Sequence, residues 1–446
     1  MTLGRSIIRA YWAVGDLEQR VTDAARIALG DGLAVMTAAV TLEPATKPFL
    51  DHAQALGGTG PARIIGRGRS VTAPMAALAN GALAHALDFE DTFEPGMIHP
   101  NASLIPAVLA LAQAQGATGG AVLKALAIGC DFACRLSLAL DGDPAQRGWY
   151  HPPVLSGLGA TLGSAHLLGL SEGQALDALG LFIAQFMLSD ELKRSPHSHL
   201  RAVREGLAAR AAVEGALLAA AGVRAVDRPL EGESGIFAQL TGNRPREGAL
   251  TGGLGESFAG PDVSIKRWPS CRGTHSAIVA ALALRDRNIH ASQILRVMVV
   301  ATPPNDMLFM PRENRIAPAT AIDAKFSIPF VFAAALAHGS IDLGTFADTQ
   351  LCDPSILDLA RRVELQAVHP SDGFEARYEV ELLDGDKIVE EVVTVPEWRV
   401  STMGLADLRP KFADCLERAG RTDLDGFLGA LADVERSGIG PLMELL

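Results

Sequence analysis

The stretch "APMAALANGALAHAL", residues 73–87, consists almost entirely of alanine, leucine and other small or apolar residues. Its apolar positions recur at i, i+3, i+4 and i+7, which predicts a helix. The same texture returns in "LIPAVLALAQAQG" (104–116), "VLKALAIGCDFACRLSLAL" (122–140) and "EGLAARAAVEGALLAAAG" (205–222). Several of these segments stop at glycine, as helix C-termini commonly do. Because alanine and glycine let helices approach closely, residues 1 to about 255 predict a tightly packed helical domain.

The texture changes after about residue 260, where short runs rich in valine, leucine and isoleucine predict strands. These runs are "ILRVMVVATP" (294–303), "VELQAV" (363–368), "RYEVELLDG" (377–385) and "KIVEEVVTV" (387–395). An Asp-Gly pair predicts a β-hairpin over 376–395, and a helix with a glycine stop is expected within 322–339. The tail from 404 onwards is helical again. The predicted fold is therefore mainly α: a large all-helical domain (1–260 and 398–446) with a smaller α+β lid domain (261–397) inserted before the C-terminal helices. A crevice between two such domains is a common place for a ligand.

The composition of the chain excludes several classes of function. The chain has 446 residues and a net charge of −12, with no long basic block, so nucleic-acid binding is not expected. Its five cysteines are scattered and form no Cys-x-x-Cys pair, which argues against a disulfide framework or a structural zinc site. The N-terminus lacks the pattern of a signal peptide, and no apolar run reaches the roughly 18 residues of a membrane span. We expect a soluble, cytoplasmic protein with no membrane partner.

Titratable side chains gather in "HALDFEDTFEPGMIHPNASLIP", residues 85–106. On a continuing helix Asp88 and Thr92 would share one face. An EF-hand loop counted from Asp88 would need glycine where Phe93 stands, which disfavours a calcium site. His99 precedes a predicted helix that Asn101 or Ser103 could cap, and a helix N-terminus is a ready anion site. A surface loop explains the spacing equally well.

We assign no catalytic role to the other carboxylates of this stretch. Glu90, Asp91 and Glu94 are expected to serve solubility, helix ends or arginine pairing.

Three further clusters have both a functional and a structural interpretation. His151 stands before two prolines and a glycine-rich helix, and taken alone it is more often structural. In "SIKRWPSCRGTHSAIVAALALR" (264–285), Thr274 can cap a helix that begins near His275. Three basic residues precede this helix: Lys266, Arg267 and Arg272. They form either an anion-binding pocket or a solvated turn. Cys271 is a possible nucleophile without an identifiable base.

The third cluster is the densest positive patch of this acidic chain. Arg201 and Arg204 are three apart and share a helix face, and four basic or titratable residues precede them: Lys193, Arg194, His197 and His199. The functional interpretation is guanidinium recognition of a carboxylate. The alternative is ordinary helix salt bridging, for example between Arg201 and Glu205.

Taken in order, these stretches resemble the MmgE/PrpD family over nearly the whole chain. The resemblance is carried by "AALANGALAHALDFEDT" followed by "HP", "YHPPVLSGLGATLGSAHLLGLS", "PLEGESGIF", "IKRWPSCRGTHSAIVAAL" and "AKFSIPFVFAAALAHGSI". It implies a helical domain with a lid, a homodimer, and a site in the cleft that uses no cofactor and no metal.

The resemblance also implies site residues. The catalytic set is Asp88, His99, His151 and Lys266. The expected substrate-binding set takes Thr92, Arg201 and Cys271 from positions matched to the family, and Arg204, Arg272 and His275 from the basic clusters described above. Two positions depart from the family, because Arg201 stands where the dehydratase and decarboxylase carry lysine, and Cys271 where the animal decarboxylase carries histidine.

The family's reactions share an enolate-like species next to a carboxylate, which needs a base, an acid and preorganised positive charge. We therefore expect a lyase acting on a small di- or tricarboxylate, first of all a hydro-lyase similar to 2-methylcitrate dehydratase. An epimerase of the iminodisuccinate type and a cis-aconitate-type decarboxylase remain alternatives, because both can use the same residue types. A non-catalytic carboxylate-binding protein is the alternative from another class.

Overall fold

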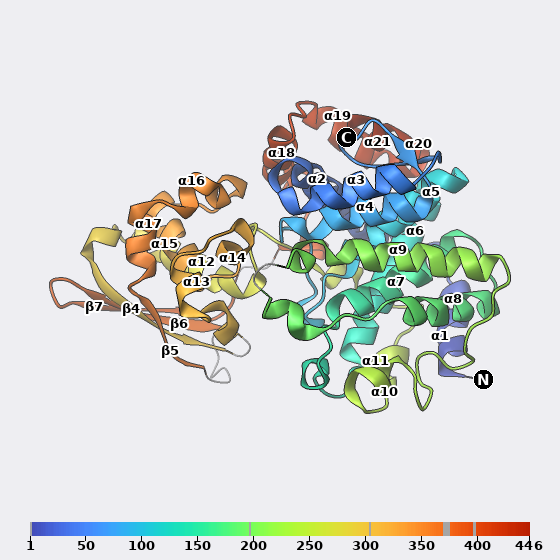
Figure 1. Cartoon of the computed structure of the whole chain (residues 1–446), viewed down its shortest axis with the longest axis horizontal. Helices are drawn as coiled ribbons and strands as arrows, with labels where there is room; N and C mark the ends of the chain where they lie inside the picture. The colour runs from blue at the N-terminus through green and yellow to red at the C-terminus, as the bar shows by residue number, and fades with distance from the viewer. Residues whose placement is uncertain (1, 196–197, 303–304, 369–374, 396–397) are drawn as a thin grey trace. The chain divides into compact units, whose positions relative to one another are not determined.

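A computed structural model describes residues 2–195, 198–302, 305–368, 375–395 and 398–446 (Figure 1). The chain divides into two compact units, one of residues 1–265 with 398–446 and one of residues 266–397. The first boundary falls after residue 265 and not after 260, because strand β3 (Ser264–Ile265) pairs with β8 (Trp398–Arg399) inside the larger unit. The mainly helical fold expected from the sequence is confirmed.

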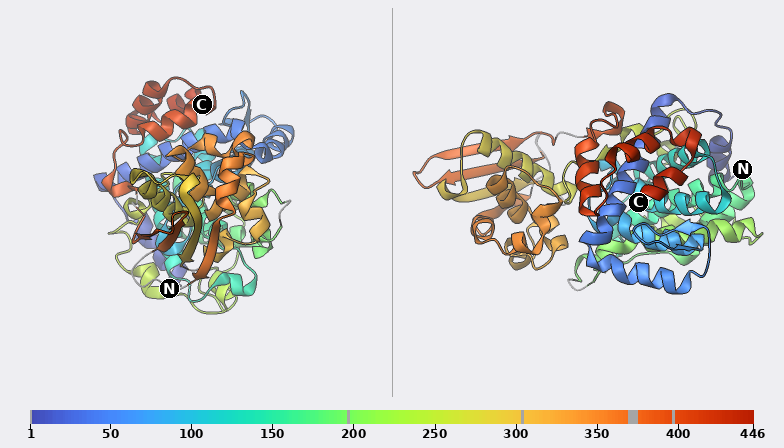
Figure 2. Two further views of the ribbon diagram at one scale, coloured as in Figure 1. Left: turned by 90° about the vertical axis from the view of Figure 1, so that its left-hand side faces the viewer. Right: turned by 90° about the horizontal axis from the view of Figure 1, so that it is seen from above.

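The larger unit is a bundle of helices with only short strands. Its N-terminal helices are α1 (Leu3–Trp12), α2 (Gln19–Leu42), α3 (Lys47–Leu56), α4 (Ala73–Ala86), α5 (Pro100–Gln115), α6 (Gly119–Leu138), α7 (Pro152–Leu167), α8 (Glu172–Gln185), α9 (Leu200–Ala220), α10 (Ile236–Thr241) and α11 (Glu247–Thr251). The C-terminal helices are α18 (Arg409–Arg418), α19 (Leu424–Ala432), α20 (Val434–Ser437) and α21 (Gly440–Leu445). A short β1–β2 ribbon (Ala62–Arg63 with Ser70–Val71) precedes α4. Helix α18 packs against α2, so the tail closes onto the first helices of the chain (Figure 2).

Helices α4 and α9 touch through glycines. A Cβ atom added to Gly206 would lie 2.3 Å from the carbonyl oxygen of Leu78, and one added to Gly81 would lie 2.7 Å from the Cα of Gly206. Helices α6 and α7 meet in the same way, since a Cβ on Gly159 would lie 2.4 Å from the carbonyl oxygen of Gly129. Glycine in this bundle therefore permits contact of one helix backbone with another, as the sequence predicts.

We expect Gly206→Ala to destabilise the protein by about 1–3 kcal/mol, because the new methyl group would meet backbone that cannot rotate away. The matched control is Gly429→Ala in α19, where nothing lies within 4 Å of the new Cβ. That control should be neutral or gain up to about 1 kcal/mol from helix propensity. Urea unfolding of the two variants checks this, and equal effects would contradict the close helix approach.

Helix α2 alone among the described residues is long and apolar enough to cross a membrane by length and composition. Within its most apolar stretch, 72% is buried among the other helices. Core helices of globular proteins pass the same test, so α2 needs no membrane to explain its composition.

The smaller unit is a four-stranded sheet covered by helices. The strand order is β5 (Val363–Val368), β4 (Ile294–Ala301), β6 (Ala376–Leu382), β7 (Lys387–Val392), with β4 parallel to β5 and antiparallel to β6. Helices α12 (His275–Asp286), α15 (Ile328–His338) and α17 (Pro354–Ala360) lie on one side of this sheet (Figure 1). The short helices α13 (Arg312–Ile316), α14 (Ala321–Lys325) and α16 (Asp348–Leu351) complete the unit. The predicted hairpin is confirmed as β6–β7, with Gly385 at φ +94° in its turn, a conformation that favours glycine.

Candidate active site

The segment between α4 and α5 turns sharply at its start. Asp88 has φ +52°, a left-handed conformation in which aspartate is tolerated better than most residues, and its N–H donates to the carbonyl of His85 at 2.9 Å. Helix α4 therefore ends at Ala86, and the expectation that Asp88 and Thr92 share a helix face is wrong. Thr92 instead pairs with Ser264 through two backbone hydrogen bonds of 2.8 Å, which fixes the path of the segment.

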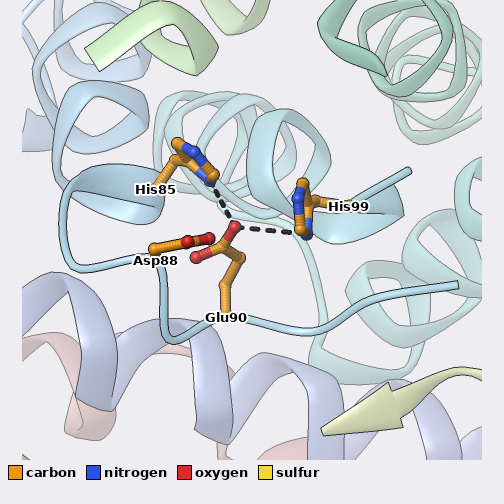
Figure 3. A group of neighbouring side chains, drawn as sticks. All are labelled: His85, Asp88, Glu90 and His99. Carbon is orange, nitrogen blue, oxygen red and sulfur yellow. Dashed lines mark hydrogen bonds and ion pairs between the residues drawn. The ribbon is translucent and has the colours of Figure 1, made fainter. Parts of the chain in front are cut away.

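This turn brings four titratable side chains together: His85, Asp88, Glu90 and His99 (Figure 3). Oε1 of Glu90 lies between the two rings, hydrogen-bonded to Nδ1 of His85 and 3.3 Å from Nδ1 of His99. The expectation that Glu90 and Asp91 serve solubility is wrong, because their exposed fractions are 2% and 3%. A buried carboxylate must be hydrogen-bonded or paired, and two histidines meet that need for Glu90.

Sequence reasoning missed His85 and Glu90 as members of this group. The available signal was that His85 lies near the end of a predicted helix and Glu90 lies just beyond that end. A left-handed residue just after a helix turns the chain back on itself, so a side chain that follows it can reach the last helical turn. Aspartate at position 88 gave no clear sign of that turn, because glycine is the usual residue there.

His99 is the member of the group that reaches the surface, with 17% of its side chain exposed against 0% for His85 and 3% for Glu90. It is the N-cap residue of α5, so Asn101 lies inside the helix and is not its cap. Asn101 donates at 2.7 Å to the carboxylate of Asp91, and the carbonyl oxygen of Asp91 lies 2.8 Å from Nδ1 of His99.

That carbonyl contact requires a proton on Nδ1 of His99, because a carbonyl oxygen only accepts hydrogen bonds. In the neutral ring Nε2 then carries the lone pair. A neutral imidazole with a lone pair on its outer nitrogen is suited to take a proton from a bound molecule. Ser103, the second predicted cap, also lies inside α5, where its hydroxyl bonds to Glu205.

Arg204 is a fully buried guanidinium in α9. Its Cζ atom lies 4.9 Å from the ring centroid of Tyr150, and its Nε lies 3.5 Å from Oε1 of Glu205. Burial alone would lower the pKa of Arg204. The charges of Tyr150 and of the carboxylates Glu205, Glu90 and Asp88 outweigh burial, so the pKa is raised. The positive charge of Arg204 therefore acts on the carboxylates of the His85–His99 group.

Arg201 lies in the first turn of α9, and its carbonyl accepts a hydrogen bond from Arg204. Burial raises the pKa of Glu205, although Arg204 and two serine hydroxyls oppose that shift. Lys193, from the positive patch that precedes α9, pairs with Asp190 at 2.7 Å. His197, from the same patch, lies outside the described residues.

His151 precedes α7 and is its N-cap residue, as the sequence predicts. Burial, followed by the charge of Lys193, lowers the pKa of His151 to about 4. At neutral pH its ring is therefore uncharged and offers one donor and one acceptor nitrogen.

The lowered pKa of His151 predicts acid sensitivity. The unfolded chain protonates this ring below its ordinary pKa of 6.5, whereas the folded protein resists until about 4, so folding stability falls as pH drops through that window. We expect His151→Gln to remove this part of the loss. The measurement is urea unfolding of wild type and variant at pH 7 and pH 5. An identical pH dependence in the two proteins would show that His151 titrates normally.

The remaining predicted site residues belong to the smaller unit. Lys266 is buried, with 2% exposed. Arg272 forms a two-pronged ion pair with Glu375 at 3.0 and 3.2 Å; although burial opposes ionisation, this partner lowers the pKa of Glu375. Arg272 could therefore bind a substrate only in competition with Glu375.

Cys271 and His275 flank the start of α12. The N–H of Cys271 donates to the carbonyl of Lys325 at 3.1 Å. Helix α12 begins at His275, as predicted, but the hydroxyl of Thr274 bonds to Ser270 and to the carbonyl of Cys271 instead of capping the helix. The ring of His275 is buried edge-on against Trp268, with centroids 5.2 Å apart. These contacts give His275 a packing role in the described structure.

The group of His85, Asp88, Glu90 and His99 also has the composition of a metal site, since one ligand atom from each lies within 4.8 Å of the others. The Nδ1 atoms of both histidines are already hydrogen-bonded, to Glu90 and to the carbonyl of Asp91. Histidines that bind a metal commonly donate their other ring nitrogen to a carboxylate or carbonyl in this way, so these bonds are compatible with a ligand set as well as with a hydrogen-bonded network.

Comparisons with known proteins cover both units. Residues 10–249 match the MmgE/PrpD N-terminal domain, and residues 268–425 match the MmgE/PrpD C-terminal domain. The chain is 26% identical over 356 residues to human cis-aconitate decarboxylase, covering 76% of this chain and 71% of that protein. It is 26% identical over 406 residues to cis-aconitate decarboxylase of Aspergillus terreus, covering 85% and 82% respectively. A cis-aconitate decarboxylase-like protein of Aspergillus oryzae is 27% identical over 363 residues, covering 75% and 73%.

Proposed function

This chain belongs to the MmgE/PrpD family and is an enzyme of the lyase type, and from that premise we propose that it removes a proton next to a carboxylate of a small di- or tricarboxylate without a cofactor. The observation that carries the proposal is the state of His99. Its Nδ1 is held by the carbonyl of Asp91 while its ring is partly exposed. A base for proton abstraction needs a fixed tautomer and a ring that a substrate can reach.

The negative charge that develops when the proton leaves must meet positive charge. Arg204 supplies a permanent charge whose field acts on this group. Arg201 and Lys266 are proposed to bind the carboxylates of the substrate, and His151 to supply a neutral N–H donor, since its pKa is lowered to about 4. Preorganised donors of this kind are usually the largest single contribution to catalysis.

Dehydration is our first candidate outcome, because it needs one base for the C–H proton and one donor for the departing hydroxide. The test is ¹H NMR of the purified protein with 2-methylcitrate, citrate and malate. A new vinyl resonance that grows with enzyme concentration supports a hydro-lyase. Inversion of a stereocentre without a vinyl product would point to an epimerase.

Decarboxylation is the second candidate, favoured by the relatives named above, all of which are cis-aconitate decarboxylases or similar to them. Here the carboxylate leaves as CO₂ and the resulting carbanion takes a proton. Incubation with cis-aconitate and measurement of released CO₂ separates the two candidates, because dehydration releases none. A homodimer in the cytoplasm is part of the same proposal.

Activity is expected to survive removal of divalent metal ions. The proposed chemistry requires only proton transfer between side chains and substrate. Dialysis against EDTA should leave kcat within about twofold, a change of roughly 0.4 kcal/mol in the barrier. Loss of activity on dialysis, restored by one added ion, would contradict this prediction.

A further inference from the structure

The carboxylate of Glu90 joins two histidines that come from different helices. His85 stands in the last turn of α4, and His99 is the residue before α5. Figure 3 shows Glu90 rising between the two rings, whose centroids are 5.1 Å apart. Glu90 itself is 2% exposed and His85 is fully buried. Such a carboxylate has little access to water, so its ring partners fix its position.

We propose that Glu90 is a positioning residue, which orients His99 and balances the positive charge that His99 acquires when it takes a proton. This inference rests on the proposed proton abstraction. The Nδ1–H of His99 points to the carbonyl of Asp91 at 2.8 Å and has Oε1 of Glu90 at 3.3 Å. A carboxylate beside the inner nitrogen of a catalytic imidazole holds the tautomer and stabilises the imidazolium.

The proton balance of the step is simple. The C–H bond of the substrate breaks, its proton forms a new N–H bond at Nε2 of His99, and the electron pair stays on the substrate carbon. The Nδ1–H bond is kept throughout, so Glu90 neither gains nor loses a proton. The ring changes from neutral to positive while Glu90 remains negative beside it, which lowers the energy of the charged ring.

His85 has a separate task in this arrangement. Its Nδ1 donates to the same Oε1 atom of Glu90, so it holds the carboxylate in place from the side that His99 does not occupy. The charged and titratable groups that face Glu90 include His85, His99 and Asp88, with Arg204 and Glu205 acting on it through their charges. Arg204 is the permanent cation among them, and its charge offsets part of the repulsion between Glu90 and Asp88.

The variant that tests the proposal is Glu90→Gln, which keeps the shape of the side chain and removes its charge. We expect kcat to fall about a hundredfold with KM little changed, in the range that general acid–base groups contribute. The acid limb of the kcat/KM profile should move to lower pH, because an imidazole without its carboxylate partner holds its proton less tightly. The matched control is Glu94→Gln in the same loop, which is half-buried and accepts from Ser264 at 3.1 Å; it should leave both quantities unchanged.

A second measurement needs no turnover. ¹⁵N NMR of the histidine rings reports which nitrogen carries the proton, and wild-type His99, assigned with His99→Gln, should be the Nδ1–H tautomer. In Glu90→Gln the share of the Nε2–H tautomer should increase. If this result holds while no polycarboxylate reacts, the proposed function fails and the positioning role stands. An Nε2–H tautomer in the wild type, or Glu90→Gln with wild-type kcat and an unmoved acid limb, would overturn the inference.

Discussion

Replacement of His99 by glutamine is expected to lower kcat by about 10²–10⁴-fold, the usual contribution of a general base. Glutamine has a similar length and can hydrogen-bond to the carbonyl of Asp91, so it keeps the contact that His99 makes there at 2.8 Å. It lacks a nitrogen lone pair that takes up a proton near neutral pH. The loss should therefore appear in kcat, with a small change in KM.

The control for this variant is His52→Gln in α3, an exposed histidine that undergoes the same substitution. Both variants should keep the melting temperature of the wild type within a few degrees, because His99 lies at the surface end of its network. If His99→Gln retained the wild-type kcat with every substrate that turns over, another residue would be the base.

Lys411→Met is expected to reduce the free energy of unfolding by about 3–5 kcal/mol, the usual cost of leaving a buried charge without its strongest partner. Nζ of Lys411 lies 2.6 Å from Asp31, and the side chains are 2% and 1% exposed. The same ammonium donates to the carbonyl of Phe89 at 2.7 Å and lies 3.9 Å from the centroid of the Phe89 ring. Methionine fills the volume but leaves the carboxylate of Asp31 in an apolar region.

Two companion variants make the result specific. Arg409→Met removes a neighbouring pair with Asp425 whose side chains are 50% and 82% exposed, and such pairs contribute about 0–1 kcal/mol. The double variant Lys411→Met with Asp31→Leu should recover most of the loss, since an apolar pair can replace a buried ion pair. A loss of less than 1 kcal/mol in the single variant, measured by urea unfolding, would contradict the burial of this pair.

Helices and the hairpin were accessible from the sequence because their signals are local. The apolar period in residues 73–87 gives helix α4, and the Asp-Gly pair gives the turn between β6 and β7. The glycine contacts between α4 and α9 follow from the same composition, since only small residues allow two helix backbones to meet.

The network around His99 was not accessible in the same way. It depends on the left-handed conformation of Asp88, which places Glu90 against His85. Lys411 was equally hidden, because its contact with Asp31 joins two ends of the chain that no local pattern connects. The departures from the family at Arg201 and Cys271 were visible in the sequence. Their effect on substrate choice is measured by turnover.

The most direct test of the central claim is deuterium exchange in D₂O, followed by ¹H NMR with citrate, 2-methylcitrate and cis-aconitate as probes. A base that removes a proton next to a carboxylate should replace a C–H signal of at least one probe with deuterium at a rate proportional to enzyme. His99→Gln should lose this exchange while Glu94→Gln retains it. Exchange that continues unchanged in His99→Gln would contradict proton abstraction by His99.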